Sequence, residues 1–131
     1  MNLINLIYIY TMNKYKLVKI SKSDKKDKKW MAEFKNLETN KNFIRHFGFN
    51  NPDDKNNDFT LHKDEVRRNR YINRAKSQLK DDPTKPAYLS MYILWGDEPD
   101  FKKSVKDYNK RLEIYNKTGK FPLKIKGYKY L

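Results

Sequence analysis

Four basic residues in the middle of the chain are spaced so that one helix would carry them on one side. They are Lys63, Arg67, Arg70 and Arg74. At 100° per residue their side chains fall within an arc of about 60°. A helix with such a stripe can lie along or in a nucleic-acid groove and neutralise phosphates. The alternative is a solvated helix face, because Asp64 and Glu65 partly offset the charge and Asp64 can pair with Arg68.

A second basic cluster precedes the middle of the chain, in a polar segment that is predicted to be a hairpin loop. Its side chains could contact phosphate, although lysine-rich loops often serve only solubility. The lysines that we assign to binding in this loop are Lys25, Lys26, Lys28 and Lys29.

The two histidines, His46 and His62, raise the question of catalysis. Together with Asp58 and Asp64 they could form a metal-dependent nuclease site. Such a site needs ligands that converge from different elements, and no P-loop or other catalytic signature accompanies them. We therefore expect structural or capping roles for both histidines, and expect neither enzymatic activity nor a cofactor.

The composition indicates a folded protein with an anionic partner. The 131 residues include 30 Lys and Arg against 16 Asp and Glu, which gives a net charge of +14. Self-repulsion on this scale favours association with a polyanion. An AT-rich gene would also raise the lysine content, but it would not place arginines in a stripe. Aromatic residues make up 15% of the chain, and their large rings can build a core in so polar a sequence.

The elements that would position these residues begin with a sheet. Alternating and β-branched patterns predict strands over 15–21, 30–35 and 42–49. In the second strand, Trp30, Ala32 and Phe34 share one face. In the third, the same holds for Phe43, Phe47 and Phe49. The short connections favour an antiparallel meander.

Helices are predicted in the second half of the chain. Thr60 is the expected N-cap of a helix that runs to about Leu79. A short apolar helix over 87–95 and an amphipathic helix over about 99–118 follow. The fold class is therefore α+β, with a three-stranded antiparallel meander followed by about three helices in a single domain over 12–118.

The two ends are expected to lie outside this domain. Residues 1–11 are apolar, but they are too short to span a membrane and lack the features of a signal peptide. Because Met12 begins a stretch that looks like a natural start, we expect residues 1–11 to be an extension from an upstream start codon. Residues 119–131 form a basic aromatic tail of the kind that binds nucleic acid, or that could pack on the sheet or dock on a partner protein.

Several pieces of the chain match a pattern that extends over residues 14–112. The pieces are His46-Phe47-Gly48, Asp58-Phe59-Thr60, His62-Lys63-Asp64, Arg67, Arg70-Tyr71, Arg74 and Ser90 to Trp95. In these the chain resembles a family of small basic proteins of unknown function from large nucleocytoplasmic DNA viruses, relatives of mimiviruses and phycodnaviruses. It departs from that family at Ala75, where a His is common, and at Tyr88-Leu89, where small residues are usual.

The resemblance implies a viral origin and brings no established activity. It implies a location in the host cytoplasm or viral factory, with packaging in the virion as an option. The function expected from the residues is sequence-non-specific binding of nucleic acid, DNA rather than RNA, in packaging or protection of a genome. The alternative is a structural or adaptor protein of a viral particle that binds an acidic protein partner. A metal-dependent nuclease is the third reading, and no membrane association is expected.

Overall fold

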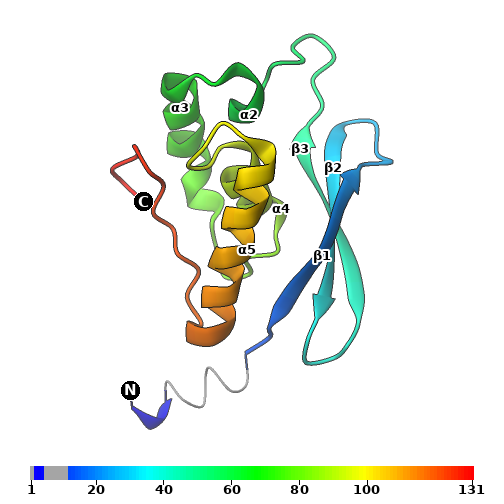
Figure 1. Cartoon of the computed structure of the whole chain (residues 1–131), viewed down its shortest axis with the longest axis vertical. Helices are drawn as coiled ribbons and strands as arrows, with labels where there is room; N and C mark the ends of the chain where they lie inside the picture. The colour runs from blue at the N-terminus through cyan, green and yellow to red at the C-terminus, as the bar shows by residue number, and fades with distance from the viewer. Residues whose placement is uncertain (1, 5–11) are drawn as a thin grey trace.

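The computed structural model describes residues 2–4 and 12–131 of the chain. Its N-terminal part, from Tyr15 to Phe49, forms a sheet of three strands. Each strand pairs antiparallel with the next along the chain, so the predicted meander is confirmed. The predicted extension over 1–11 falls mostly outside the described residues. The strands are β1 (Tyr15–Lys22), β2 (Lys28–Asn36) and β3 (Asn42–Phe49) (Figure 1).

A bulge in β1 keeps two apolar residues on the same face of the sheet although they are three positions apart. Leu17 pairs with Phe34, and Ile20 pairs with Ala32. Val18 lies within the irregularity and is 44% exposed. Without the extra residue, Ile20 would point to the outer face, because side chains in a regular strand alternate between the faces.

The helical half is divided more finely than the sequence pattern predicts. Its α-helices are α2 (Phe59–His62), α3 (Glu65–Ala75), α4 (Pro86–Leu89) and α5 (Phe101–Thr118). A short 3-10 turn, η1 (Lys76–Gln78), extends α3, and a π-helical turn, η2 (Ser90–Leu94), extends α4. None of the helices among the described residues is both long and apolar enough to cross a membrane.

The single helix predicted from Thr60 to Leu79 is wrong, because the backbone breaks between α2 and α3. Lys63 ends α2 in the left-handed conformation, with φ 58°. Asp64 then caps α3 by accepting hydrogen bonds from the backbone N–H groups of Val66 and Arg67. The predicted N-cap is corrected as well: Asp58 caps α2 and accepts from the N–H of Thr60.

The helices cover one face of the sheet (Figure 1), with α4 packed on β3 and α5 packed on β1. The core lies between these two layers. Phe34 and Phe47 enter it from the sheet, and Tyr108 enters it from α5; all three are 0% exposed. On the opposite face of the sheet the described residues place no helix (Figure 1), and side chains such as Ile44, which is 49% exposed, face outward there.

The C-terminal segment 119–131 packs on the helices, on the side away from the sheet (Figure 1). Ile125 is 0% exposed and Tyr128 is 6% exposed. The ring of Phe121 lies 5.0 Å from that of Tyr92 and 5.1 Å from that of Tyr88. Of the roles considered for this tail, packing is the one observed, although on the helices and not on the sheet.

Gly48 allows β3 to approach η2 closely. Its φ is +81°, and a Cβ atom at this position would lie 2.8 Å from Cδ1 of Leu94. The left-handed backbone alone costs about 1–2 kcal/mol for other residues, so we expect Gly48→Ala to lower the free energy of unfolding by at least that amount. Urea unfolding followed by circular dichroism measures it, with Ser21→Ala on the outer face of β1 as control. Equal midpoints for the two variants would contradict this expectation.

Candidate nucleic-acid interface

A groove of about 1030 Å³ separates the end of the sheet from α3. The end of β3 and the loop 50–58 form one wall, and α3 forms the other, with parts of α4 and η2 between them. We call this hollow the groove. Its charged lining residues are the cations Lys28, Lys29, Arg67, Arg70 and Arg74 and the acids Asp54 and Asp58.

Three of the four predicted stripe residues line the groove. Arg67, Arg70 and Arg74 stand three and four positions apart on α3, so they share one side of the helix. Lys63 does not line it, because it belongs to the left-handed junction between α2 and α3. The 100° geometry that placed Lys63 in the stripe does not apply across this break, so the stripe is corrected to the three arginines.

The arginines of the stripe differ in how much of their charge is already engaged. Arg67 donates to Oδ2 of Asp54 at 3.4 Å. Arg70 and Arg74 are exposed, and neither forms an ion pair with any of the described residues. A guanidinium carries five N–H donors and no acceptor. The guanidinium groups of Arg70 and Arg74 are therefore available to donate hydrogen bonds to a ligand in the groove.

The lysines predicted for one hairpin loop divide between two places. Lys25 and Lys26 lie in the turn between β1 and β2, whereas Lys28 and Lys29 begin β2 and line the groove. The prediction that all four belong to the loop is therefore corrected for the last two. Nζ of Lys29 is 2.6 Å from Oδ2 of Asp58, so this lysine mainly neutralises a buried carboxylate.

Aromatic side chains complete the groove. The rings of Tyr71 and Trp95 stack with centroids 4.3 Å apart and an interplanar angle of 9°. Phe49, which was predicted to share the core face with Phe47, is instead 60% exposed in the groove wall. It is the last residue of β3, and the left-handed backbone of Gly48 just before it interrupts the alternation of the strand. The polar run that begins at Asn50 is the sequence signal that could have identified it as a residue at the edge of the core.

Burial raises the pKa of Tyr71 from 10.0 to about 12, while a hydrogen bond with Ser90 and the charge of Arg74 act in the opposite direction. The folded protein therefore keeps this proton at pH values where the unfolded chain loses it. Stability should fall as the pH rises from about 10 to about 12, because the unfolded state then binds fewer protons.

We accordingly expect Tyr71→Phe to reduce the loss of unfolding free energy over this alkaline range. Urea unfolding at a series of pH values measures the loss. Tyr130→Phe is the control, because it removes the hydroxyl of a tyrosine that is 69% exposed. If the Tyr71 variant loses as much stability as the unmodified protein does, the assignment to Tyr71 fails.

The two histidines make local contacts. Nδ1 of His46 lies 2.7 Å from Oγ of Ser23. His62 stands in the last turn of α2, not in the first turn of a long helix, and its Nδ1 accepts from the N–H of Asp64 at 2.9 Å. Across residues 2–4 and 12–131, no three His, Asp or Glu side chains gather in a way that could hold a metal ion. The nuclease reading therefore has no supporting geometry in this part of the chain.

A family of unknown function (DUF5754) matches residues 18–75 of the chain. The matched segment runs from within β1 to the end of α3, so it includes the three arginines of α3 and the opposite wall of the groove. No curated protein and no solved structure matches the chain. The similarity covers both walls of the groove and carries no activity with it.

Proposed function

We propose that the protein binds nucleic acid, DNA in particular, in the groove and does so without reading the base sequence. The observation that carries the proposal is the row of arginines on α3, of which Arg70 and Arg74 are exposed and in no ion pair with described residues. A guanidinium matches the geometry of a phosphate through paired hydrogen bonds. Contacts to phosphate fix the position of a nucleic acid but carry no sequence information.

The charge balance of the groove supports this proposal. Five lysine and arginine side chains line it against two carboxylates. Both carboxylates already have basic partners, since Asp54 pairs with Arg67 and Asp58 pairs with Lys29. The excess positive charge of the groove is therefore available to a ligand.

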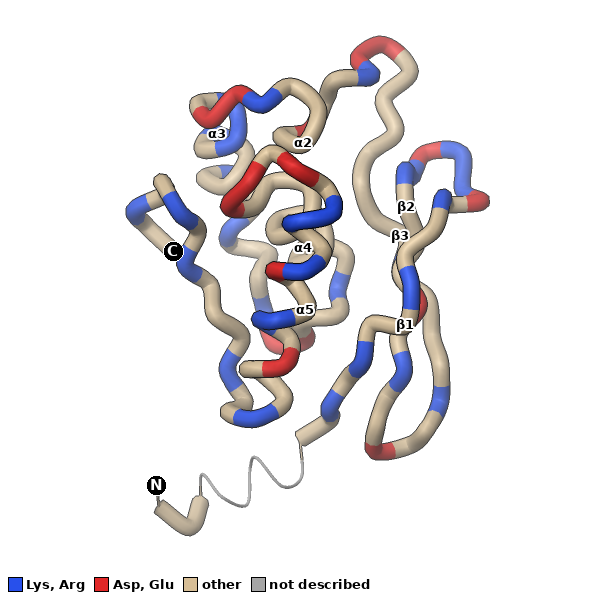
Figure 2. Tube along the Cα trace, in the orientation of Figure 1, with Lys and Arg blue, Asp and Glu red and all other residues tan. Residues whose placement is uncertain are grey.

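The charge of the whole molecule supports rapid association. Lys and Arg recur along the strands, α3, α5 and the C-terminal segment (Figure 2), and the net charge is +14. Such a field attracts a polyanion from many directions and makes the rate of encounter sensitive to salt. The groove then determines where the polyanion is held. Through the resemblance to proteins of large DNA viruses, we assign this binding to the packaging or protection of a genome.

Fluorescence anisotropy with a labelled DNA oligonucleotide, titrated over a series of salt concentrations, tests the proposal. The logarithm of the binding constant should fall linearly with the logarithm of the salt concentration, with a slope of about −0.7 to −0.9 per phosphate contacted. The DNA should remain intact when magnesium is added. Failure to bind at about 0.15 M salt, with binding of polyglutamate instead, would replace this proposal with an adaptor for acidic proteins.

A further inference from the structure

A second hollow of about 790 Å³ adjoins the groove. Three residues line both spaces, namely Lys28, Lys29 and Asp58, so the two meet at the Lys29–Asp58 ion pair. The turn between β1 and β2, the loop 50–58, α2 and α3 all lie at one end of the molecule (Figures 1 and 2). The two hollows therefore form one path across that end.

The lining of the second hollow combines an apolar wall with a basic rim. Trp30 and Phe101 stack with ring centroids 4.6 Å apart, and Leu61 beside them is 47% exposed. Five lysines line the same hollow, against the two carboxylates of Asp24 and Asp58. The lysines that line the second hollow without lining the groove are Lys22, Lys25 and Lys26.

We infer that the groove and the second hollow together bind one single-stranded polynucleotide, which crosses from one to the other over the Lys29–Asp58 pair. This inference rests on the proposed function and names its ligand more narrowly. Proteins that bind single strands combine a basic path for the backbone with aromatic surfaces for the bases. Phe49 in the groove and the Trp30–Phe101 pair in the second hollow supply the aromatic surfaces, and the lysines and arginines supply the path.

The shape of the groove disfavours a duplex. A helix with its side chains is about 10–12 Å across, and the major groove of DNA is about 12 Å wide. A recognition helix must therefore stand clear of the rest of its protein on the side that meets the DNA. The basic side of α3 instead faces a hollow whose other wall is the end of β3 and the loop 50–58. A flexible single strand can enter this space, whereas a rigid duplex meets its opposite wall first.

The ion pair at the junction allows a strand to pass. Asp58 alone would repel a phosphate, but Lys29 lies 2.6 Å from its carboxylate and neutralises it. Asp58 also accepts hydrogen bonds from the N–H and hydroxyl of Thr60, at 3.0 and 2.5 Å. The carboxylate is thus held in place, and Lys28, which forms no ion pair with the described residues, lines both hollows as well.

Oligonucleotides of graded length test this inference, with the full-length chain and anisotropy as the readout. Single strands of about 4 to about 16 nucleotides span the usual range of site sizes, and a duplex of the longest sequence is compared with them. The variant Lys25→Ala/Lys26→Ala removes two exposed charges from the second hollow. Lys106→Ala/Lys110→Ala is the matched control, because it removes two exposed charges from α5 outside both hollows.

We expect the longest single strand to bind at least about tenfold more tightly than the duplex. Relative to the control variant, the Lys25/Lys26 variant should bind the longest oligonucleotide about tenfold more weakly. Its affinity for the shortest oligonucleotide should be nearly unchanged. Equal affinity for the duplex and the longest single strand would overturn the inference. So would a loss of affinity in the Lys25/Lys26 variant that is the same at every oligonucleotide length, or the same as in the control variant. In these cases nucleic acid still binds, so the proposed function stands; if no nucleic acid binds at all, the proposed function itself fails.

Discussion

Replacing Arg70 and Arg74 together with alanine should weaken the binding of nucleic acid by about a hundredfold. Hydrogen bonds to charged groups contribute about 1.5–3 kcal/mol each, and 1.4 kcal/mol corresponds to a tenfold change. The slope of the logarithm of the binding constant against that of the salt concentration should also become shallower, by about 0.7 for each phosphate of a single strand that the variant no longer neutralises. Anisotropy titrations of the variant over a salt series measure both quantities.

The Lys106→Ala/Lys110→Ala variant separates a local effect of the groove from the general effect of charge. Both variants lose two exposed positive charges from a helix, and alanine is a good helix former, so the fold should persist in both. The control should lose far less affinity. If the two variants bind equally weakly, net charge and not the groove would explain binding, and if neither loses affinity the assignment of the arginines is wrong.

Arg111→Ala should lower the free energy of unfolding by about 3 kcal/mol, because it breaks a buried network and removes one donor from each of its acceptors. The side chain of Arg111 is 8% exposed. Its guanidinium donates to Oδ2 of Asp107 at 2.7 Å, to the carbonyl oxygen of Pro122 at 2.7 Å, and to both carboxylate oxygens of Asp97 at 3.3 Å. It also lies 4.7 Å from the ring centroid of Tyr92.

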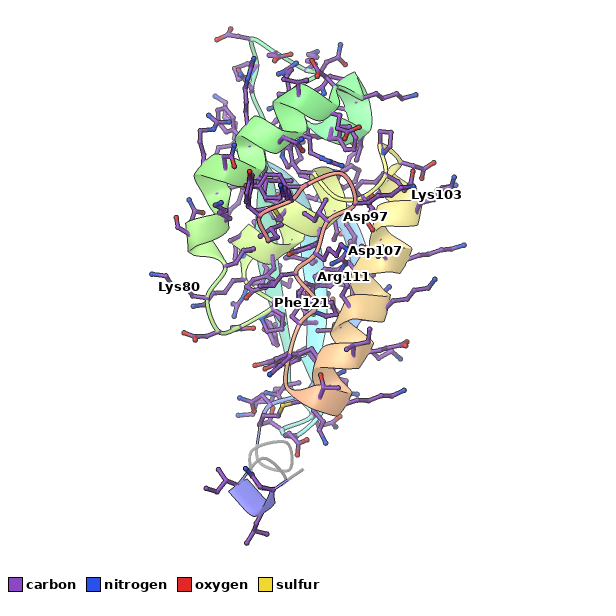
Figure 3. All side chains as sticks on the ribbon, turned by 90° about the vertical axis from the view of Figure 1, so that its left-hand side faces the viewer. Lys80, Asp97, Lys103, Asp107, Arg111 and Phe121 are labelled. Carbon is purple, nitrogen blue, oxygen red and sulfur yellow. The ribbon has the colours of Figure 1, made fainter. Side chains whose placement is uncertain are left out.

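This arginine joins α5 to the loop before it and to the C-terminal segment, and Figure 3 shows it between Asp97, Asp107 and that segment near Phe121. Its loss should therefore also loosen the packing of the segment. Urea unfolding measures the change in stability, and near-ultraviolet circular dichroism reports the aromatic cluster around Phe121. Arg111→Lys should restore only part of the stability, since one ammonium cannot reproduce the planar fork of a guanidinium. Lys110→Ala, on the exposed side of the same helix, should be nearly neutral, and a neutral Arg111→Ala would contradict the role of the network.

The sheet could be predicted because its strands show alternating or β-branched patterns and lie between polar turns, although the bulge in β1 shifts the alternation at Val18. The break at Lys63 could not, since the residues on both sides fit one continuous helical period. A left-handed conformation at a lysine has no signal in its residue type. Asp64 did hold a signal for a new helix start, because aspartate is a favoured N-cap, but the same residue also suited an ion pair with Arg68.

The wall of the groove that α3 forms could be predicted in part from the sequence. The opposite wall, formed by the end of β3 and the loop 50–58, could not. The spacing of Arg67, Arg70 and Arg74 places them together on any helix that contains them. Whether they face open solvent or a hollow depends on where the loop 50–58 packs, and its composition says only that it is a loop. Ile125 shows the same limit: a single apolar residue among lysines does not reveal a packed segment, yet its side chain is 0% exposed.

Amide chemical-shift mapping by nuclear magnetic resonance, with a single-stranded oligonucleotide titrated into the labelled protein, tests most directly whether the groove is the binding surface. We expect the largest shifts along α3, at the start of β2 and at the end of β3, with smaller shifts in the turn between β1 and β2. Shifts confined to α5, or to the outer face of the sheet around Lys16 and Lys35, would show that the nucleic acid binds elsewhere and would contradict the assignment of the groove.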